Sequence, residues 1–147
     1  MGKWNIRVAL PEDANGLQEC MEKAYSTYQV RMGGERLPPM DINYSKEIAE
    51  FPTWVVELDD QITGGIIMSF EGDYASIANI AVHPQFQGKG IGGGLLTFAE
   101  NKAKEKNYLR LRLATHILLT ENISLYKHLG WTETDRDDTR VYMEKGI

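Results

Sequence analysis

The sequence predicts an α+β fold, with a mixed, mostly antiparallel central sheet and helices on both faces. Three observations predict it: β-rich stretches separated only by short polar turns, a glycine-rich loop that opens an amphipathic helix, and a further strand after that helix. A strand–helix–strand order makes its two strands parallel, so the sheet is mixed. At 147 residues the chain is long enough for one core, and we expect a single domain over residues 1–147.

The N-terminal third alternates strand and helix signals. Residues 6–10 favour a strand that Pro11 ends, and the acidic residues after Pro11 favour a helix that continues to about Val30. Paired glycines and prolines make residues 31–42 a loop, and a short helix is expected over residues 44–51. Apolar residues of the first helix recur at three- and four-residue steps: Leu17, Met21, Ala24 and Tyr28.

The centre of the chain is rich in β-forming residues. Residues 53–58 and 62–70 are predicted to form a hairpin, and residues 74–82 follow as a third antiparallel strand. Residues 109–115 alternate as the strand that runs parallel to residues 74–82. The intervening helix, over residues 90–107, carries on one face Ile91, Leu95, Ala99 and Ala103.

The C-terminal part is predicted to be a helix followed by a hairpin. The helix runs from about Thr120 to Leu129, and Gly130 follows it at a position that favours a left-handed residue. Residues 131–135 and 140–144 pair as the closing hairpin.

Composition narrows the function classes. Sixteen Lys and Arg against 21 Asp and Glu give a net charge of −5, so no nucleic-acid partner is expected. No apolar run approaches the ~18 residues of a membrane span, so no membrane association is expected, and the polar start does not resemble a secretory signal. Cys20 is the only cysteine, which favours a reducing, cytoplasmic location. The three histidines and Cys20 lack zinc-ligand spacing, so no metal is expected.

A run of glycines marks the start of the central helix. The segment reads Gln87-Gly88-Lys89-Gly90-Ile91-Gly92-Gly93-Gly94. Glycines let the backbone approach a ligand closely, and the unpaired N–H groups of a first helical turn favour a phosphate or pyrophosphate. The simpler interpretation is a flexible connection or close helix–strand packing. Because each glycine costs a helix ~1 kcal/mol relative to alanine, we favour the phosphate site.

Two standard nucleotide motifs fit this loop poorly. Residues 83–87 separate it from its strand, and the acid that a dinucleotide site needs after the next strand is missing. Lys89 is followed by Gly90 rather than Ser or Thr, which excludes a P-loop.

The segment resembles instead the GCN5-related N-acetyltransferase (GNAT) family. Gln87, Gly90 and Gly92 fill the family motif Gln/Arg-x-x-Gly-x-Gly/Ala between a strand and a helix. A second family segment, Leu-Tyr-x-x-x-Gly-Phe, is similar to residues 125–131. Element order and both motifs agree with the family over roughly residues 5–145, so the resemblance implies the GNAT fold.

The resemblance implies acetyl-CoA as co-substrate. Its diphosphate would lie on the amides from Gln87 to Gly93, and its pantetheine would pair like an extra strand in a V between the two parallel strands. A bulge in the first of these strands would direct an N–H near Ile80 or Val82 toward the thioester oxygen. The cofactor-binding residues expected on this basis are Ile80, Ala81, Val82, Gln87, Gly88, Lys89, Gly90, Ile91, Gly92, Gly93, Asn122 and Tyr126.

Asn122 is included although the chain departs from the family nearby. Many members carry Asn seven residues before the tyrosine, where this chain has Leu119. Asn122 and Tyr126 are four residues apart and therefore share a helix face, so Asn122 could reach the cofactor. The alternative is that it only satisfies backbone groups in the first helical turn.

Tyr126 is expected to be the general acid that protonates the departing CoA thiolate. A phenol of pKa ~10 can protonate a thiolate of pKa ~8.5, whereas the alternative is a packing residue. The attacking amine must also lose a proton. His116, at the end of the second parallel strand, is the best-placed catalytic base, or else a strand-end residue that meets solvent; Glu71 and Asn79 could act through water.

We therefore expect an N-acetyltransferase that moves an acetyl group from acetyl-CoA to a primary amine by direct transfer in a ternary complex. Acyl transfer with another acyl group or acceptor, and a non-catalytic acyl-CoA-binding module, remain open. The acceptor is a small-molecule or peptide amine, and the loop over residues 31–42, with Arg31 and Arg36, is expected to select it. Met21, Tyr25 and Tyr28 belong either to that site or, as we favour, to the core. Family members are often dimers, so a homodimer is also considered.

Overall fold

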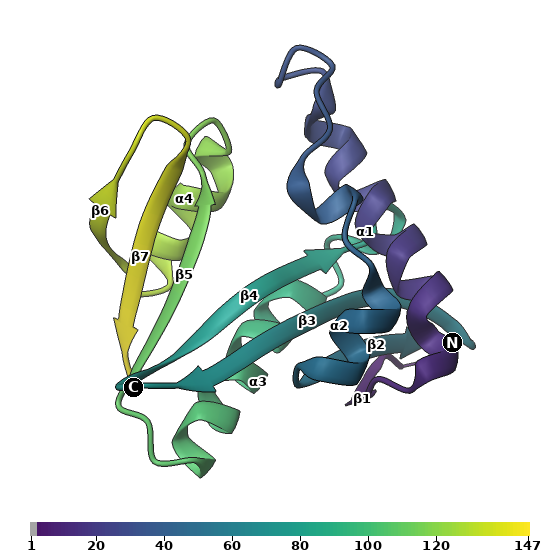
Figure 1. Ribbon diagram of the computed structural model, residues 1–147, viewed down its shortest axis with the longest axis horizontal. Coiled ribbons are helices and arrows are strands. Elements are labelled where there is room, and N and C mark those ends of the chain that lie inside the picture. The colour runs from purple at the N-terminus through teal and green to yellow at the C-terminus, as the bar shows by residue number, and fades with distance from the viewer. Residues whose placement is uncertain (1–2) are drawn as a thin grey trace.

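The computed structural model describes residues 3–147 and has one mixed sheet with helices around it (Figure 1). The strand order is β1-β2-β3-β4-β5-β7-β6, and every neighbouring pair is antiparallel except β4–β5. The predicted fold class is therefore confirmed. The strands are β1 Asn5–Val8, β2 Thr53–Leu58, β3 Gln61–Glu71, β4 Tyr74–Val82, β5 Arg110–His116, β6 Thr132–Arg136 and β7 Arg140–Gly146, and the α-helices are α1 Ala14–Gln29, α2 Tyr44–Glu50, α3 Ile91–Glu105 and α4 Thr120–His128.

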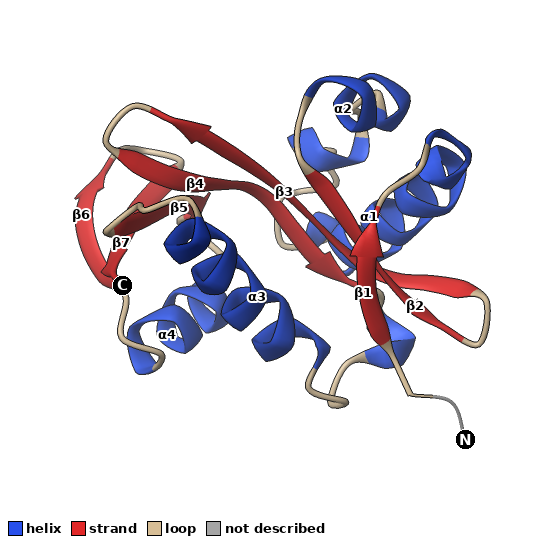
Figure 2. Cartoon of the chain, turned by 90° about the horizontal axis from the view of Figure 1, so that it is seen from below, coloured by secondary structure: helices blue, strands red, loops and turns tan. Residues whose placement is uncertain are grey.

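The helices lie on both faces of the sheet, as predicted. α1 and α2 cover one face, and α3 and α4 lie on the other (Figure 2). The core is divided accordingly. One buried cluster, which includes Leu17 and Tyr44, lies under α1 and α2, and the other, which includes Leu95 and Met143, lies under α3 and α4.

The local signals in the sequence have clear structural counterparts. Asp59 and Asp60 both adopt positive φ in the tight turn between β2 and β3. Gly130, with φ +98°, follows the last turn of α4 as a left-handed residue. The predicted buried face of α3 is observed, since all four of its expected residues are buried: Ile91, Leu95, Ala99 and Ala103.

The start of α1 differs from its prediction, because a short 3₁₀ turn at Pro11–Asp13 precedes it. The carboxylate of Asp13 is buried and accepts two hydrogen bonds from Arg7 at 2.7 and 2.9 Å and one from the backbone N–H of Leu10 at 2.7 Å. The hydrogen bonds from Arg7 lower the pKa of Asp13. This ion pair joins the beginning of α1 to β1.

β4 and β5 pair only over a short stretch and then diverge. The pairs are Ala75 with Leu111 and Ser76 with Arg112, beyond which the strands form the two arms of a V (Figure 1). A bulge leaves Ala78 of β4 unpaired with β3, because Ile67 pairs with Asn79 while Met68 pairs with Ile77. The bulge and the V both lie where the family resemblance implied them.

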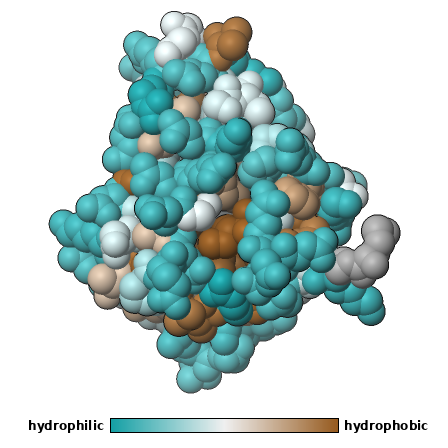
Figure 3. All heavy atoms as spheres, turned by 90° about the vertical axis from the view of Figure 1, so that its right-hand side faces the viewer, coloured by the Kyte–Doolittle hydropathy of each residue, from teal (hydrophilic) through white to brown (hydrophobic). Residues whose placement is uncertain are grey.

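The face in Figure 3 is largely hydrophilic, with hydrophobic side chains gathered near its centre. Within residues 3–147, no helix combines the length and apolar character that crossing a bilayer requires.

Candidate active site

Two adjoining cavities lie along β4, and the larger occupies the V between β4 and β5. The larger, of about 1070 Å³, extends toward the loop over residues 31–42 and toward β7, while the smaller, of about 320 Å³, extends toward the start of α3. Residues that line both cavities define their junction, and they come from α1, β4 and α4: Tyr25, Ile80, Asn122 and Tyr126.

The glycine-rich loop forms one end of the smaller cavity. Gly88 and Gly90 each have φ +82°, a conformation that residues with a Cβ rarely adopt. The first backbone hydrogen bond of α3 runs from Gly94 N–H to the Gly90 carbonyl at 2.9 Å. The preceding N–H groups, from Gly88 to Gly93, find no acceptor among residues 3–147. This end of the cavity is therefore suited to an anionic group.

The placement of the predicted cofactor residues is nearly complete. Apart from Lys89, every one of them lines the smaller cavity: Ile80, Ala81, Val82, Gln87, Gly88, Gly90, Ile91, Gly92, Gly93, Asn122 and Tyr126. The carbonyl of Lys89 instead accepts a hydrogen bond of 3.1 Å from Nε1 of Trp4.

The consecutive glycines 92–94 do not share one role. A Cβ added at Gly93 would meet no atom of the chain within 4 Å, and Gly93 lines the smaller cavity. A Cβ at Gly94 would overlap the indole ring of Trp4. Gly94 therefore makes room for Trp4, which is the packing interpretation, while Gly93 leaves open space facing the cavity.

The inner edge of β4 offers free backbone groups to the junction. His83 donates its backbone N–H to Thr63 of β3 at 2.8 Å. Because backbone groups alternate in direction along a strand, those of Ile80 and Val82 point away from β3, into the V. The Ile80 carbonyl accepts a hydrogen bond of 3.2 Å from the hydroxyl of Tyr25.

A buried hydrogen-bond network supports this edge from behind. Asn79 is buried; its Oδ1 accepts from Tyr25 at 3.2 Å and its Nδ2 donates to the hydroxyl of Tyr44 at 3.2 Å. Tyr44 in turn donates to the carbonyl of Pro39, in the loop over residues 31–42. The network joins α1, α2 and that loop to β4, immediately after its bulge. The sequence offered no signal for the role of Tyr44.

Tyr126 packs against the core and also faces both cavities. Its ring packs edge-on against Trp131, with centroids 5.9 Å apart, and only 9 % of the residue is exposed. Its hydroxyl has no hydrogen-bond partner within residues 3–147, and the residue lines both cavities. Burial raises the pKa of Tyr126 to about 12, so the phenol keeps its proton at neutral pH.

Asn122 is half-buried and faces the junction. Its side chain makes no hydrogen bond within residues 3–147, so the alternative role of satisfying backbone groups in the first turn of α4 is not observed there. The amide is free to meet a ligand from either cavity.

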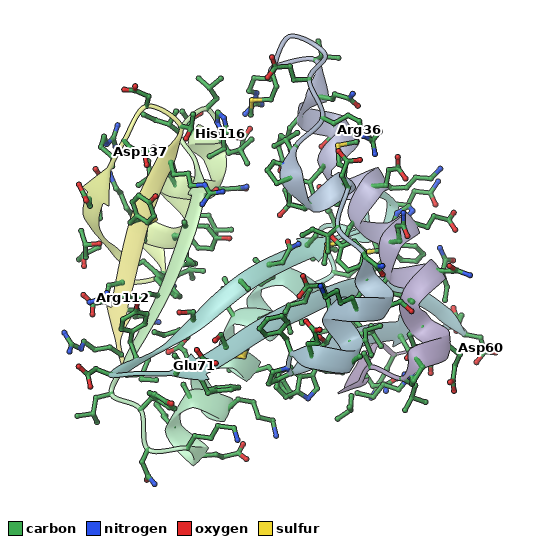
Figure 4. All side chains as sticks on the ribbon, viewed as in Figure 1. Arg36, Asp60, Glu71, Arg112, His116 and Asp137 are labelled. Atoms are coloured by element: carbon green, nitrogen blue, oxygen red, sulfur yellow. The ribbon has the colours of Figure 1, made fainter. Side chains whose placement is uncertain are left out.

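The histidines occupy different environments. His116 lines the larger cavity at the end of β5, and its Nδ1 accepts the backbone N–H of Leu118 at 3.1 Å. His83 is buried and accepts the N–H of Gln85, and His128 is exposed on α4. Glu71 lines neither cavity and lies where the strands join, far along the V from His116 (Figure 4).

The loop over residues 31–42 borders the larger cavity, but both of its arginines are engaged by carboxylates. Arg31 holds Glu121 of α4 with contacts of 2.6 and 2.9 Å, and Arg36 holds Asp41 at 2.8 Å and Glu22 at 3.0 Å. Figure 4 shows Arg36 across the opening from His116. The sequence did not single out several further lining residues, which come from β5, β7 and the start of β4: Tyr74, Arg112, Arg140 and Tyr142.

The sequence favoured a core position for three residues of α1, and the structure places them differently from one another. Met21 is fully buried in the core, as favoured; Tyr25 packs against the same core cluster and also lines both cavities, and Tyr28 lines the smaller. No group of three or more His, Cys, Asp or Glu side chains within residues 3–147 is arranged to hold a metal ion.

A sheet that opens between two parallel strands, beside a glycine-rich helix start, defines the class of acetyltransferase-like domains. A model of the acetyltransferase (GNAT) domain matches residues 49–133, more than half of the chain, and the chain belongs to this family. An uncharacterized N-acetyltransferase of Escherichia coli K12, YjgM, is 33% identical over 86 residues, which are 56% of this chain and 52% of that protein. The match thus spans about half the length of that curated relative.

Solved structures share the whole fold. The PaiA N-acetyltransferase from Thermoplasma acidophilum, in complex with coenzyme A, has a TM-score of 0.86 at 22% identity and covers 99% of both chains. The ribosomal-protein-S18-alanine N-acetyltransferase from Escherichia coli has a TM-score of 0.76 at 17% identity, covering 99% of this chain and 94% of that one. At these identities the likeness describes the fold alone.

Proposed function

We propose that this protein is an N-acetyltransferase that moves an acetyl group from acetyl-CoA to a primary amine by direct transfer in a ternary complex. One observation carries the proposal. The two cavities meet at Ile80 and Tyr126, so a donor entering from one side and an acceptor from the other would come together beside a free backbone edge and a protonated phenol. Family membership supports acyl-CoA chemistry.

The smaller cavity suits acetyl-CoA. The free N–H groups from Gly88 to Gly93 would hold its diphosphate, and the space beside Gly93 is room that a Cβ would fill. The inward backbone groups of Ile80 and Val82 would pair with the pantetheine amides like a neighbouring strand. The coenzyme A complex of the Thermoplasma acidophilum relative is in keeping with this assignment.

Acetyl-CoA supplies a thioester whose acetyl carbon bonds to the amine nitrogen while the carbon–sulfur bond breaks. A backbone N–H of Ile80 or Val82 stabilises the negative charge that develops on the carbonyl oxygen, an effect often worth ~2.7–4 kcal/mol. Tyr126 donates its hydroxyl proton toward the leaving sulfur, because burial keeps the phenol protonated at neutral pH. Asn79 and Tyr25 hold the edge of β4 in register for these contacts.

The proton of the attacking amine passes to water in the larger cavity. Nδ1 of His116 already accepts the Leu118 N–H, so the neutral imidazole carries its proton on Nε2 and presents a donor. Asn79 is an amide held by two tyrosines, and Glu71 lines neither cavity. None of the three candidate bases is therefore arranged to accept this proton directly.

Direct transfer is favoured over an acyl-enzyme on Cys20. The thiol is buried in α1 and lines neither cavity, and burial raises the pKa of Cys20 to about 12. A thiol that stays protonated and out of reach is a poor nucleophile.

A turnover screen tests the proposal. We expect calorimetry to show CoA binding in preference to NAD, and acetyl-CoA to acetylate at least one member of a panel of primary amines. CoA binding without turnover on any amine would support the alternative function, a non-catalytic acyl-CoA-binding module. Faster transfer from a longer acyl-CoA would indicate a different acyl donor. Preference for NAD would reject the cofactor assignment.

A further inference from the structure

We propose that the acceptor amine also carries a carboxylate, and that Arg140 and His116 bind this carboxylate. The inference rests on the proposed function, because it names the class of acceptor for the same site. It is drawn from the wall of the larger cavity that β5 and β7 form, opposite the loop over residues 31–42.

His116 and Arg140 are directly opposite each other on β5 and β7. The next pair exchanges a backbone hydrogen bond, from Ile117 N–H to Thr139 at 2.9 Å. His116 and Arg140 therefore form a non-hydrogen-bonded pair, the type in which facing side chains lie closest, with Cβ atoms ~4.5–5.5 Å apart.

The two side chains share the face of the sheet that the core leaves free. Leu113 on β5 and Val141 on β7 are buried in the cluster beneath α3 and α4. Side chains alternate along a strand, so His116 and Arg140 point to the opposite face, and both line the larger cavity. Helices α1 and α2 cover the β2–β4 part of that face and leave the β5–β7 part uncovered (Figure 2).

Arg140 differs from the other arginines of this cavity. Arg31 and Arg36 are held by carboxylates, and Arg112 contacts Glu144 at 3.5 Å while its guanidinium lies 3.9 Å from the centre of the Tyr74 ring. Arg140 has no carboxylate oxygen within 4 Å among residues 3–147. In a chain with a net charge of −5, a cavity-lining guanidinium without such a partner favours an anionic ligand.

His116 completes a set of donors. Since Nδ1 accepts from the backbone, the ring presents Nε2–H beside the guanidinium. Two kinds of N–H donor facing one space match the two oxygens of a carboxylate. Nearby Asp137 is engaged elsewhere: its oxygens accept from Thr139 N–H, Arg140 N–H and the hydroxyl of Tyr142.

The cavity also contains negative charge, which is consistent with a zwitterionic acceptor. Glu35 and Asp135 line it, and neither has an ion-pair partner among residues 3–147. These carboxylates attract the ammonium form of the acceptor to the cavity, whereas Arg140 and His116 anchor its opposite end. The proposed acceptors are thus amino acids or peptides with a free carboxylate, rather than diamines.

Matched acceptors provide the test. For a series of ω-amino acids of increasing length, kcat/KM is compared with that of the corresponding amino amide, which has the same shape without the charge. We expect the wild type to prefer the acid by roughly 10- to 100-fold at the best length, the effect of a charged hydrogen bond. Arg140→Gln should remove this preference, lowering kcat/KM for the acid and leaving that for the amide unchanged.

Two further variants sharpen the test. Arg110→Gln removes the same charge from the same face of β5, but Arg110 lines neither cavity, so it should keep the preference. His116→Gln should lower kcat/KM for the acid and leave that for the amide unchanged. A loss of kcat on both acid and amide would instead assign His116 as the base. No preference in the wild type, or equal losses on acid and amide in Arg140→Gln, would overturn the proposal. A stronger preference for an aminoalkylphosphonate than for the ω-amino acid would show that the site binds a phosphate-like group rather than a carboxylate.

A binding measurement keeps the two proposals separable. Titration of the free protein with butyrate should shift the NMR signals of the His116 imidazole, and butanamide should not. Arg140→Gln should abolish the response to butyrate. These signals do not depend on turnover, so an anion site can be found in a protein that acetylates nothing. Absence of the shift in an enzyme that acetylates amines would reject the carboxylate site alone.

Discussion

The two cavities are built from different parts of the chain. The smaller is lined chiefly by residues 80–93, which are nearly continuous in the sequence and rich in glycine, with Leu96 and a few residues from α1 and α4 added. The larger is lined by side chains from α1, the loop over residues 31–42, β4, β5 and β7. A site of backbone groups requires glycines and a strand edge, so it depends on local sequence. A site of side chains depends on which distant elements meet.

The two sides also differ in what they leave free. Around the smaller cavity, the N–H groups of the glycine loop have no acceptor in the described chain, so they are available to bind a ligand. Around the larger, Arg31, Arg36 and Arg112 are already paired with carboxylates, and Arg31 joins the end of α1 to α4. Specificity on that side therefore depends on the few groups that internal pairing leaves free.

The largest effect is expected at the junction, where both sides depend on one hydroxyl. Tyr126→Phe retains the ring that packs on Trp131 and removes only the proton donor. We expect kcat to fall on the order of 10²–10⁴-fold, with CoA affinity nearly unchanged. Steady-state kinetics and calorimetry on the folded variant check this. Wild-type kcat would reduce Tyr126 to a packing residue and make water the proton source.

Adjacent glycines test whether the backbone of the loop binds the diphosphate. Gly93→Ala adds a Cβ that touches no atom of the chain, so it should stabilise α3 by up to ~1 kcal/mol while lowering CoA affinity about 10-fold. Gly94→Ala places its Cβ in the Trp4 ring and should destabilise the fold by ~1–3 kcal/mol. Thermal unfolding and calorimetry on both variants separate the two roles. Undiminished affinity in Gly93→Ala would move the diphosphate elsewhere.

This contrast explains how much the sequence could predict. Strand and helix periodicity, the turn residues and both motifs predicted the fold and most of the residues that line the smaller cavity, because those signals are local. Lys89 alone among the predicted cofactor residues does not line the smaller cavity, and its carbonyl accepts from Trp4, which only the fold brings near. The alternation of side chains along residues 109–115 could be predicted, but not the pairing of His116 with Arg140, which depends on the register of β5 and β7. Nor could the sequence reveal that Arg31 and Arg36 are already engaged.

A smaller effect is expected at Trp4, which tests whether its hydrogen bond to Lys89 positions the glycine loop for CoA binding. Trp4→Phe keeps an aromatic ring against Gly94 but loses the hydrogen bond from Nε1 to the Lys89 carbonyl. A net hydrogen bond is worth ~1 kcal/mol, so CoA affinity should fall about fivefold with kcat unchanged. Trp54→Phe is the control, since Trp54 lies in the core and lines neither cavity. Equal affinities in the two variants would show that Trp4 does not orient the loop.

The smallest effect is expected on the pH dependence of kcat, which should be nearly flat in the alkaline range. A general acid must hold its proton, and it loses activity as pH rises through its pKa. An ordinary phenol, with a pKa of ~10, would be half ionised at pH 10, whereas burial raises the pKa of Tyr126 to about 12. At saturating substrates, with an acceptor amine whose pKa is below 8, kcat should therefore stay level from pH 8 to about pH 10.5.

Folding limits the upper end of this profile. The buried phenols of Tyr25, Tyr44 and Tyr126 have raised pKa values in the folded state, so the stability that they contribute is complete below ~10 and declines as pH rises toward the folded values. Circular dichroism at each pH confirms that the enzyme is folded where kcat is measured. A fall in kcat centred near pH 10, present in the wild type and absent from Tyr126→Phe, would mean that the phenol titrates as if exposed. The junction would then be open to solvent during catalysis, and burial would not be what keeps the acid protonated.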